Sequence, residues 1–140
     1  TLNAWDFPET SRVHFEKQDR DLVIAGKPRG SRGKGMRAVT HAAFTVALLE
    51  FTLIQTKPHP VFVVLDTPLL AYRETEGEDD DLSGTDVNDR FFEHLADIND
   101  RQIFVLENID PPGAVEAKAS ATFFSKNPHS VRYGLFPYTE

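Results

Sequence analysis

The feature that most constrains the fold is an apolar run, residues 61–65, that lies between Pro60 and Asp66. Most of its residues are β-branched or aromatic, which favours a strand over a helix. Since polar residues do not interrupt the run, it predicts a strand buried on both faces, as in parallel sheets covered by helices. Asp66 follows at the carboxyl end, where α/β sheets bind their ligands. The sequence therefore predicts that Asp66 holds a metal ion such as Mg²⁺.

A second apolar strand is expected at Gln102–Leu106, followed directly by Glu107 and Asn108. A helix is expected before it, at residues 86–98, with Thr85 as its N-cap. Its expected apolar face, at helical spacing, consists of Val87, Phe91, Leu95 and Ile98. The order strand, helix, strand predicts a parallel βαβ unit. If the two strands are neighbours, Asp66 and Glu107 lie side by side, where two acids could bind a metal or divide into an acid and a base. Alternatively, each acid simply ends its strand or caps a following helix.

The N-terminal third predicts a β-hairpin and a long helix. Residues Arg12–Glu16 alternate polar with apolar, which indicates a strand with one buried face, and Leu22–Ile24 is expected to return beside it. A helix is expected over residues 36–54, mostly buried because its polar stripe is narrow. The polar residues of that stripe are Arg37, His41 and Thr45. Near the C-terminus, residues 121–124 and 131–136 are expected to form a last strand pair.

The charges are segregated along the chain, whose net charge is −7. Residues 74–81 hold six carboxylates, so residues 74–84 are expected to form a flexible acidic loop. Residues 27–37 hold five bases among several glycines, just before the long helix. Glycines and a helix N-terminus favour anion binding. The candidate ligand residues are Ser31, Gly33, Lys34 and Gly35. A flexible surface loop is the alternative interpretation.

Length and composition exclude several classes of protein. With 140 residues, a single domain over residues 1–140 is expected. The absence of cysteine excludes disulfide and thiol chemistry and suits the cytoplasm. No uninterrupted apolar run reaches the roughly 18 residues of a membrane span, so no membrane partner is expected. The histidines show no metal-ligand spacing.

The order of these segments resembles the C-terminal lobe of an SMC-like ABC ATPase head, of the double-strand-break-repair class. The resemblance covers residues 12–113: a glycine loop with a long helix, a strand ending in Asp66 with Pro68 after it, an acidic insertion and another apolar strand. It implies an α/β fold, in which a β-hairpin precedes βαβ units with a parallel sheet, as a P-loop NTPase half-domain of ABC type. It also implies ATP and Mg²⁺ as cofactors, a dimer of two heads, a coiled coil and DNA as partner.

The resemblance assigns roles to individual residues. Residues 31–35 resemble the signature loop, which contacts the γ-phosphate held by the opposite subunit. Val61–Asp66 is similar to Walker B, which makes Asp66 the metal acid. Thr67 falls at the position of the family's catalytic acid, and Asn108 falls near its switch histidine.

The departures from the family pattern concern catalysis. The hydroxyl of Thr67 does not act as a base at neutral pH, so Glu107 is the alternative candidate for the base. Walker A, the GxxxxGK[ST] loop, is absent from this chain, which therefore needs an N-terminal lobe of the same protein to complete an ATP site. Alone, the chain is expected to be inactive and to expose an apolar face.

The function expected from the resemblance is ATP-driven dimerisation of heads in DNA repair, chromosome maintenance or defence against foreign DNA. One alternative is a non-catalytic ABC-like module that binds nucleotide or protein. Another is a nucleic-acid-binding domain that uses the basic loop on phosphates. The third is a metal nuclease built on Asp66, Glu107 and Lys118.

Overall fold

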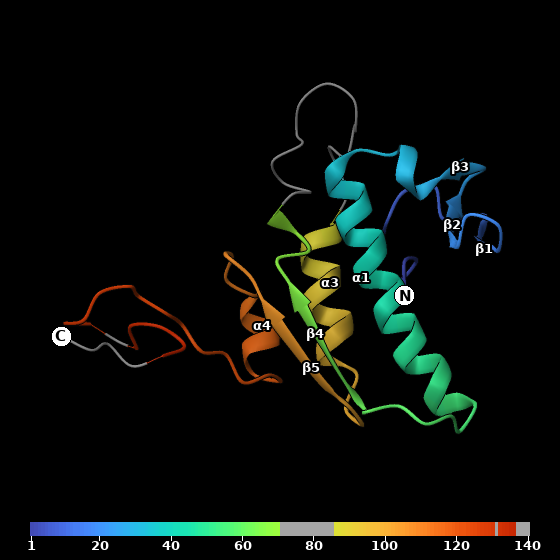
Figure 1. Cartoon of the computed structure of the whole chain (residues 1–140). Helices are drawn as coiled ribbons and strands as arrows, with labels where there is room; N and C mark the ends of the chain where they lie inside the picture. The colour runs from blue at the N-terminus through green and yellow to red at the C-terminus, as the bar shows by residue number, and fades with distance from the viewer. Residues whose placement is uncertain (71–85, 131, 137–140) are drawn as a thin grey trace.

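The computed structural model describes residues 1–70, 86–130 and 132–136. The chain is mixed α/β, with a three-stranded antiparallel sheet and a two-stranded parallel sheet (Figure 1). The predicted α/β class is therefore confirmed at this level. The predicted acidic loop at 74–84 and the predicted cap Thr85 lie outside the described residues.

The predicted hairpin is present near the N-terminus. β1 (Val13–Glu16) and β2 (Asp21–Ile24) pair in antiparallel fashion, and a third strand, β3 (Lys27–Pro28), was not predicted. The predicted buried face of β1 is wrong, because Val13 and Phe15 are exposed. On this exposed strand the ring of Phe15 stacks on Phe44 of the long helix, with centroids 6.0 Å apart, whereas Ile24 of β2 is fully buried.

The long helix α1 (Lys34–Ile54) begins two residues earlier than predicted. One side of it is buried, whereas Phe44, Leu48 and Phe51 on the other side are exposed, so the prediction of a mostly buried helix is wrong. Among the described residues, α1 is the one helix long and apolar enough to span a membrane by length and composition. The core helix of a soluble protein meets that test too, and the buried side of α1 belongs to the core.

The core forms where the N-terminal segment, α1 and the helix α3 (Val87–Ala96) meet. Trp5 is fully buried and makes an edge contact with Phe91, with ring centroids 4.8 Å apart. The predicted apolar face of α3 is confirmed, with Val87, Phe91 and Leu95 buried. The N-cap position is Asp86, which makes no capping hydrogen bond with its side chain.

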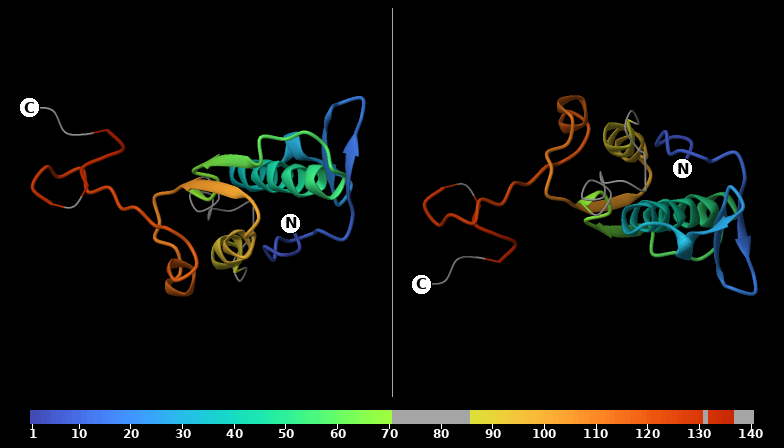
Figure 2. Two further views of the ribbon diagram at one scale, coloured as in Figure 1. Left: turned by 90° about the horizontal axis from the view of Figure 1, so that it is seen from below. Right: turned by 90° about the horizontal axis from the view of Figure 1, so that it is seen from above.

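The predicted parallel pair is also confirmed. β4 (Phe62–Asp66) and β5 (Gln102–Leu106) run side by side, in register from the pair Phe62–Gln102 to the pair Asp66–Leu106. The helix α3 and the short helix α4 (Gly113–Glu116) lie on one side of this sheet (Figure 2). Since the crossover between the strands contains α3, these elements form the expected βαβ unit.

The two faces of the parallel sheet differ, which corrects the prediction of strands buried on both sides. The inner face carries Leu65, Ile103 and Val105, which belong to the core or pack against it. The outer side chains are between 45% and 54% exposed: Phe62, Val64, Phe104 and Leu106. No described helix covers them, because α3 and α4 share the inner side. The expected exposed apolar face is therefore present.

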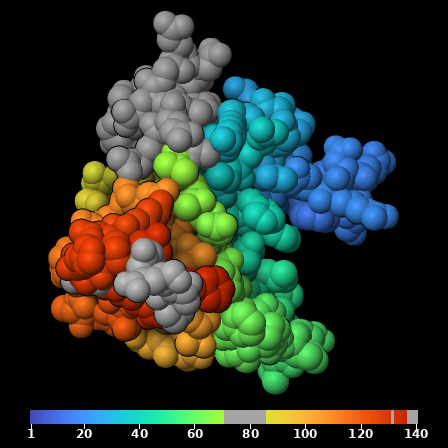
Figure 3. Space-filling view, turned by 60° about the vertical axis from the view of Figure 1, so that its left-hand side comes forward, coloured from blue at the N-terminus to red at the C-terminus, as the bar shows by residue number. Residues whose placement is uncertain are grey.

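The C-terminal segment is irregular. The described parts of residues 121–136 contain no strand, so the predicted strand pair is not found there. Backbone hydrogen bonds link parts of the segment to each other: Ser125 N–H donates to Arg132 O, Lys126 N–H to Tyr133 O, and Ser130 N–H to Asn127 O. Its start, residues 121–126, lines a cavity with residues of α3 and α4. The remainder extends away from the helices (Figure 1), and Figure 3 shows the molecule with this segment in front.

Candidate functional site

The predicted acids Asp66 and Glu107 lie at the same edge of the parallel sheet. Asp66 is opposite Leu106, so Glu107 is one residue beyond the end of the paired region. Successive side chains of a strand point to opposite faces. Asp66 therefore continues the outer face, whereas Glu107 continues the inner face with Ile103 and Val105, beside which it lines a cavity. The expectation of carboxylates side by side is corrected: they share an edge but not a face.

The carboxylate of Glu107 is bound to backbone. Its Oε1 accepts a hydrogen bond from the N–H of Leu69 at 2.7 Å, and its Oε2 accepts one from the N–H of Asn108 at 3.3 Å. The first bond is short and charge-assisted, which makes it one of the stronger kinds. Glu107 thus joins the end of β5 to the turn that follows β4.

That turn contains Thr67, the residue at the predicted catalytic position. Its backbone φ is +46°, in the left-handed region that β-branched residues rarely adopt. Its N–H donates to Leu106 O at 2.8 Å, and its hydroxyl lies 3.4 Å from Asp66 Oδ1. Pro68 follows and itself disfavours helical conformations at the preceding residue. The backbone next to Asp66 is therefore strained and held in place by β5.

Asp66 is exposed at the end of β4, with its carboxylate on the outer face. Within the residues described, no group of three or more acids and histidines could hold a metal ion. A cation at Asp66 would thus need further oxygen ligands, and Mg²⁺ commonly takes these from water and substrate phosphates.

The basic glycine loop is partly neutralised by ion pairs. Arg29 Nε lies 2.6 Å from Asp21 Oδ1, and Arg32 Nη1 lies 2.8 Å from Glu9 Oε2. Hydrogen bonds from these guanidinium groups lower the pKa of both carboxyl groups, Asp21 and Glu9, below their ordinary values. Arg32 also donates to Ile24 O at 2.6 Å, which ties the loop to the hairpin. These two arginines are structural, which sequence reasoning did not foresee.

The remaining part of the loop leads directly into α1. Gly33 occupies the N-cap position without a side-chain cap, and Lys34 is the exposed first residue of the helix. Gly35 is buried, and the hydroxyl of Ser31 donates to Pro28 O at 2.8 Å. This helix N-terminus and the carboxyl end of β4 lie at the same end of the molecule (Figure 1). An anion there would meet backbone N–H groups and the ammonium of Lys34.

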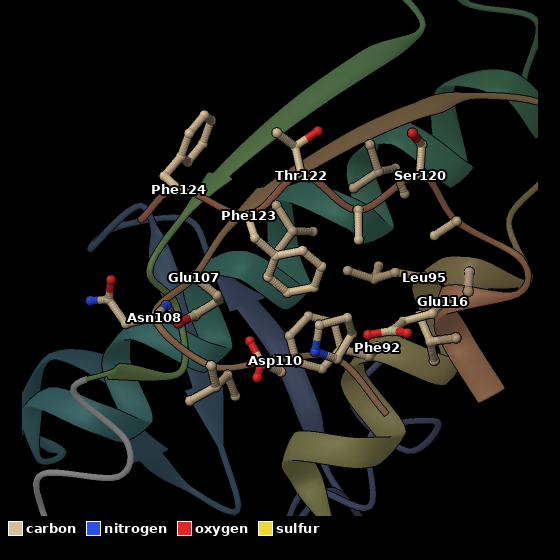
Figure 4. A pocket seen from close by; sticks show the side chains of 18 of the residues that line it. Phe92, Leu95, Glu107, Asn108, Asp110, Glu116, Ser120, Thr122, Phe123 and Phe124 are labelled. Carbon is tan, nitrogen blue, oxygen red and sulfur yellow. Dashed lines mark hydrogen bonds between the residues drawn. The ribbon is translucent and has the colours of Figure 1, made fainter. Parts of the chain in front are cut away.

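A cavity of about 540 Å³ lies between α3, β5, α4 and residues 119–126. Phe92 and Phe123 line its middle, with Glu107 on one side and Glu116 on the other (Figure 4). Sequence reasoning missed this cavity, because residues 119–126 carry no motif and reach it only through the tertiary structure. The side chain of Glu107 is therefore part of the wall of this cavity.

The three residues of the predicted nuclease site do not converge. Lys118 Nζ lies 2.6 Å from Asp97 Oδ1, directly after the C-terminal end of α3. That ion pair raises the pKa of Lys118. Since α3 leads back toward the start of β5, Lys118 and Glu107 belong to opposite ends of the strand.

The chain matches no protein-family model, no curated protein and no solved structure.

Proposed function

We propose that this chain is the C-terminal lobe of an SMC-like ABC ATPase head, which binds Mg·ATP together with a Walker A lobe. The observation that carries the proposal is Asp66, an exposed carboxylate at the carboxyl end of a parallel strand. An acid at this place holds Mg²⁺ in P-loop NTPases, where positioned charge does most of the catalysis. The N-terminus of α1 lies at the same end and suits a phosphate.

The bare outer face of the sheet supports a half-domain. Parallel sheets are almost always covered on both faces, yet this one exposes four large apolar side chains: Phe62, Val64, Phe104 and Leu106. Burying them under another lobe would be favourable. In the complete protein, two heads would dimerise around ATP, with residues 31–35 against the γ-phosphate of the opposite head. The proposed setting is cytoplasmic DNA repair, chromosome maintenance or defence against foreign DNA.

The test uses the complete protein, in which a Walker A lobe accompanies this chain. We expect Mg²⁺-dependent ATP hydrolysis that falls by roughly 10²-fold or more in Asp66→Asn. Asp110→Asn, at an exposed acid beyond β5, is the matched control and should retain activity. Full activity in Asp66→Asn would contradict the proposal. ATP binding without turnover would instead favour the non-catalytic switch, in keeping with Thr67 at the catalytic position.

A nucleic-acid-binding domain is the second candidate, and the bases of the glycine loop favour it. Lys27, Lys34 and Arg37 are exposed and occur in none of the ion pairs of the described residues. Such a domain would bind DNA without ATP, with an affinity that falls steeply as salt rises. Lys34→Met should then weaken DNA binding at low salt in the absence of ATP. If binding to DNA instead requires ATP in both the wild type and Lys34→Met, the ATPase is favoured.

A further inference from the structure

We infer that Glu107 is a positioning residue: it holds the turn after β4 and thereby sets the direction of Asp66. The inference rests on the proposed function of Asp66, and it replaces the prediction that Glu107 is the base. It follows from the contacts of three residues in that turn, Thr67, Pro68 and Leu69.

The turn has two backbone N–H groups, since Pro68 has none. Both donate to β5 or to the residue directly after it. Thr67 N–H donates to Leu106 O at 2.8 Å, and Leu69 N–H donates to Glu107 Oε1 at 2.7 Å. The Glu107 carboxylate therefore supplies one of the two bonds that attach the turn to the sheet.

The strain at Thr67 makes this attachment necessary. A left-handed conformation at a β-branched residue persists only where the surrounding structure holds it. Leu69 is fully buried, so without Glu107 its N–H would remain unsatisfied inside the protein. We expect the turn to rearrange in that case. Asp66 would move with it, because it is directly bonded to Thr67.

The position of Glu107 disfavours a role as base. Both of its oxygens already accept backbone N–H groups, and its side chain follows the inner face of the sheet. Asp66 follows the outer face. A base must reach the attacking water within hydrogen-bond distance, beside the phosphate that the metal holds. A residue on the opposite face is better placed to support Asp66 than to share its substrate.

The experiment separates the two roles by chemistry. Glu107→Gln keeps a carbonyl oxygen for Leu69 N–H but cannot act as a base, whereas Glu107→Leu removes the acceptor. In this chain, amide hydrogen exchange of Leu69 is measured by NMR relative to Val46 in the middle of α1. We expect the Leu69 amide to remain protected from exchange in Glu107→Gln. In Glu107→Leu its protection factor should fall by at least about tenfold. Glu116→Leu, at an exposed acid that lines the same cavity, should change the exchange rate of neither the Leu69 amide nor the Val46 amide.

The second measurement is Mg²⁺-dependent ATP hydrolysis by the complete protein. We expect Glu107→Gln to retain turnover within about threefold and Glu107→Leu to lose about tenfold or more. Loss of turnover in Glu107→Gln with Leu69 still protected would overturn the inference and establish a base. Unchanged protection in Glu107→Leu would also overturn it. Glu107→Ala repeats both measurements if Glu107→Leu does not fold. If the wild type neither binds nor hydrolyses ATP, the proposed function fails, while the exchange data still decide whether Glu107 holds the turn.

Discussion

The two faces of the β4–β5 sheet have similar side chains and opposite surroundings. On the inner face Val63 and Leu65 are 7% and 4% exposed, whereas on the outer face Phe62 and Val64 are 45% and 54% exposed. The apolar character of a strand therefore indicates that both of its faces are suited to burial, but not that both are covered. Coverage depends on the layers that the chain itself supplies, and here both α3 and α4 lie on one side. The bare face is where we expect the partner lobe.

The largest effect should separate the faces directly. Leu65→Ala should lower the free energy of unfolding by about 2–5 kcal/mol, because it leaves a cavity in the core. Val64→Ala, one residue away on the outer face, should cost no more than about 1 kcal/mol, the range of strand propensity. Urea unfolding of both variants with unchanged m values measures the difference. Equal losses in the two variants would mean that the outer face is covered in solution, which would contradict the difference in burial between the two faces.

A smaller effect should reveal what the outer face does when it is uncovered. Phe62 and Phe104 meet edge to face there, with ring centroids 6.4 Å apart. We expect the isolated chain to self-associate through this surface, and the double variant Phe62→Thr/Phe104→Thr to weaken association roughly tenfold. Sedimentation velocity over a range of concentrations measures it. Phe51→Thr, an exposed aromatic position on α1, is the control and should leave association unchanged; if it acts equally, α1 is the surface involved.

The smallest effect concerns the core beneath the inner face, where the hydrogen bond between Trp5 and His94 should make the free energy of unfolding depend on pH. Trp5 Nε1–H donates to His94 Nδ1 at 3.1 Å, which requires that this nitrogen carry no proton. Burial lowers the pKa of His94 below 6.5, and the nearby carboxylates Glu50 and Asp97 oppose this shift. The folded state thus binds a proton less readily than the unfolded state, so the free energy of unfolding should decrease as the pH falls below about 6.5.

Urea unfolding between about pH 7.5 and about pH 5 measures this contribution. His94→Gln should reduce the pH dependence, because the group that titrates is gone. His129→Gln, at an exposed histidine outside the core, should leave it unchanged. Identical pH profiles for the wild type and His94→Gln would exclude His94 as the source.

Much of the local structure could be predicted from residue patterns. The unbroken apolar runs at 61–65 and 103–106 predicted two neighbouring parallel strands, and the helical spacing of Val87, Phe91 and Leu95 predicted the buried face of α3. Patterns of this kind depend on backbone geometry and on nearby residues. The candidate Asp66 was found in the same way, because it is the first charge after its strand.

Other features could not be predicted, because they depend on contacts between distant segments. The sequence shows five bases in the glycine loop. It does not show that Arg29 pairs with Asp21 and that Arg32 pairs with Glu9. The buried side of α1 likewise depends on where Trp5 and α3 pack, and no local periodicity specifies that choice. The third strand β3 is too short to produce a pattern of its own.

The apolar run that ends in Asp66 shows where this division falls. The sequence by itself determined that residues 62–66 form a strand, that the strand pairs in parallel with β5, and that a carboxylate stands at its end. Only the tertiary structure decided which face is covered, and that Glu107 turns inward to bind Leu69 N–H while Asp66 remains on the bare face. The physical reason is that strand formation depends on local sterics and side-chain type, whereas burial and hydrogen-bond partners depend on the whole chain.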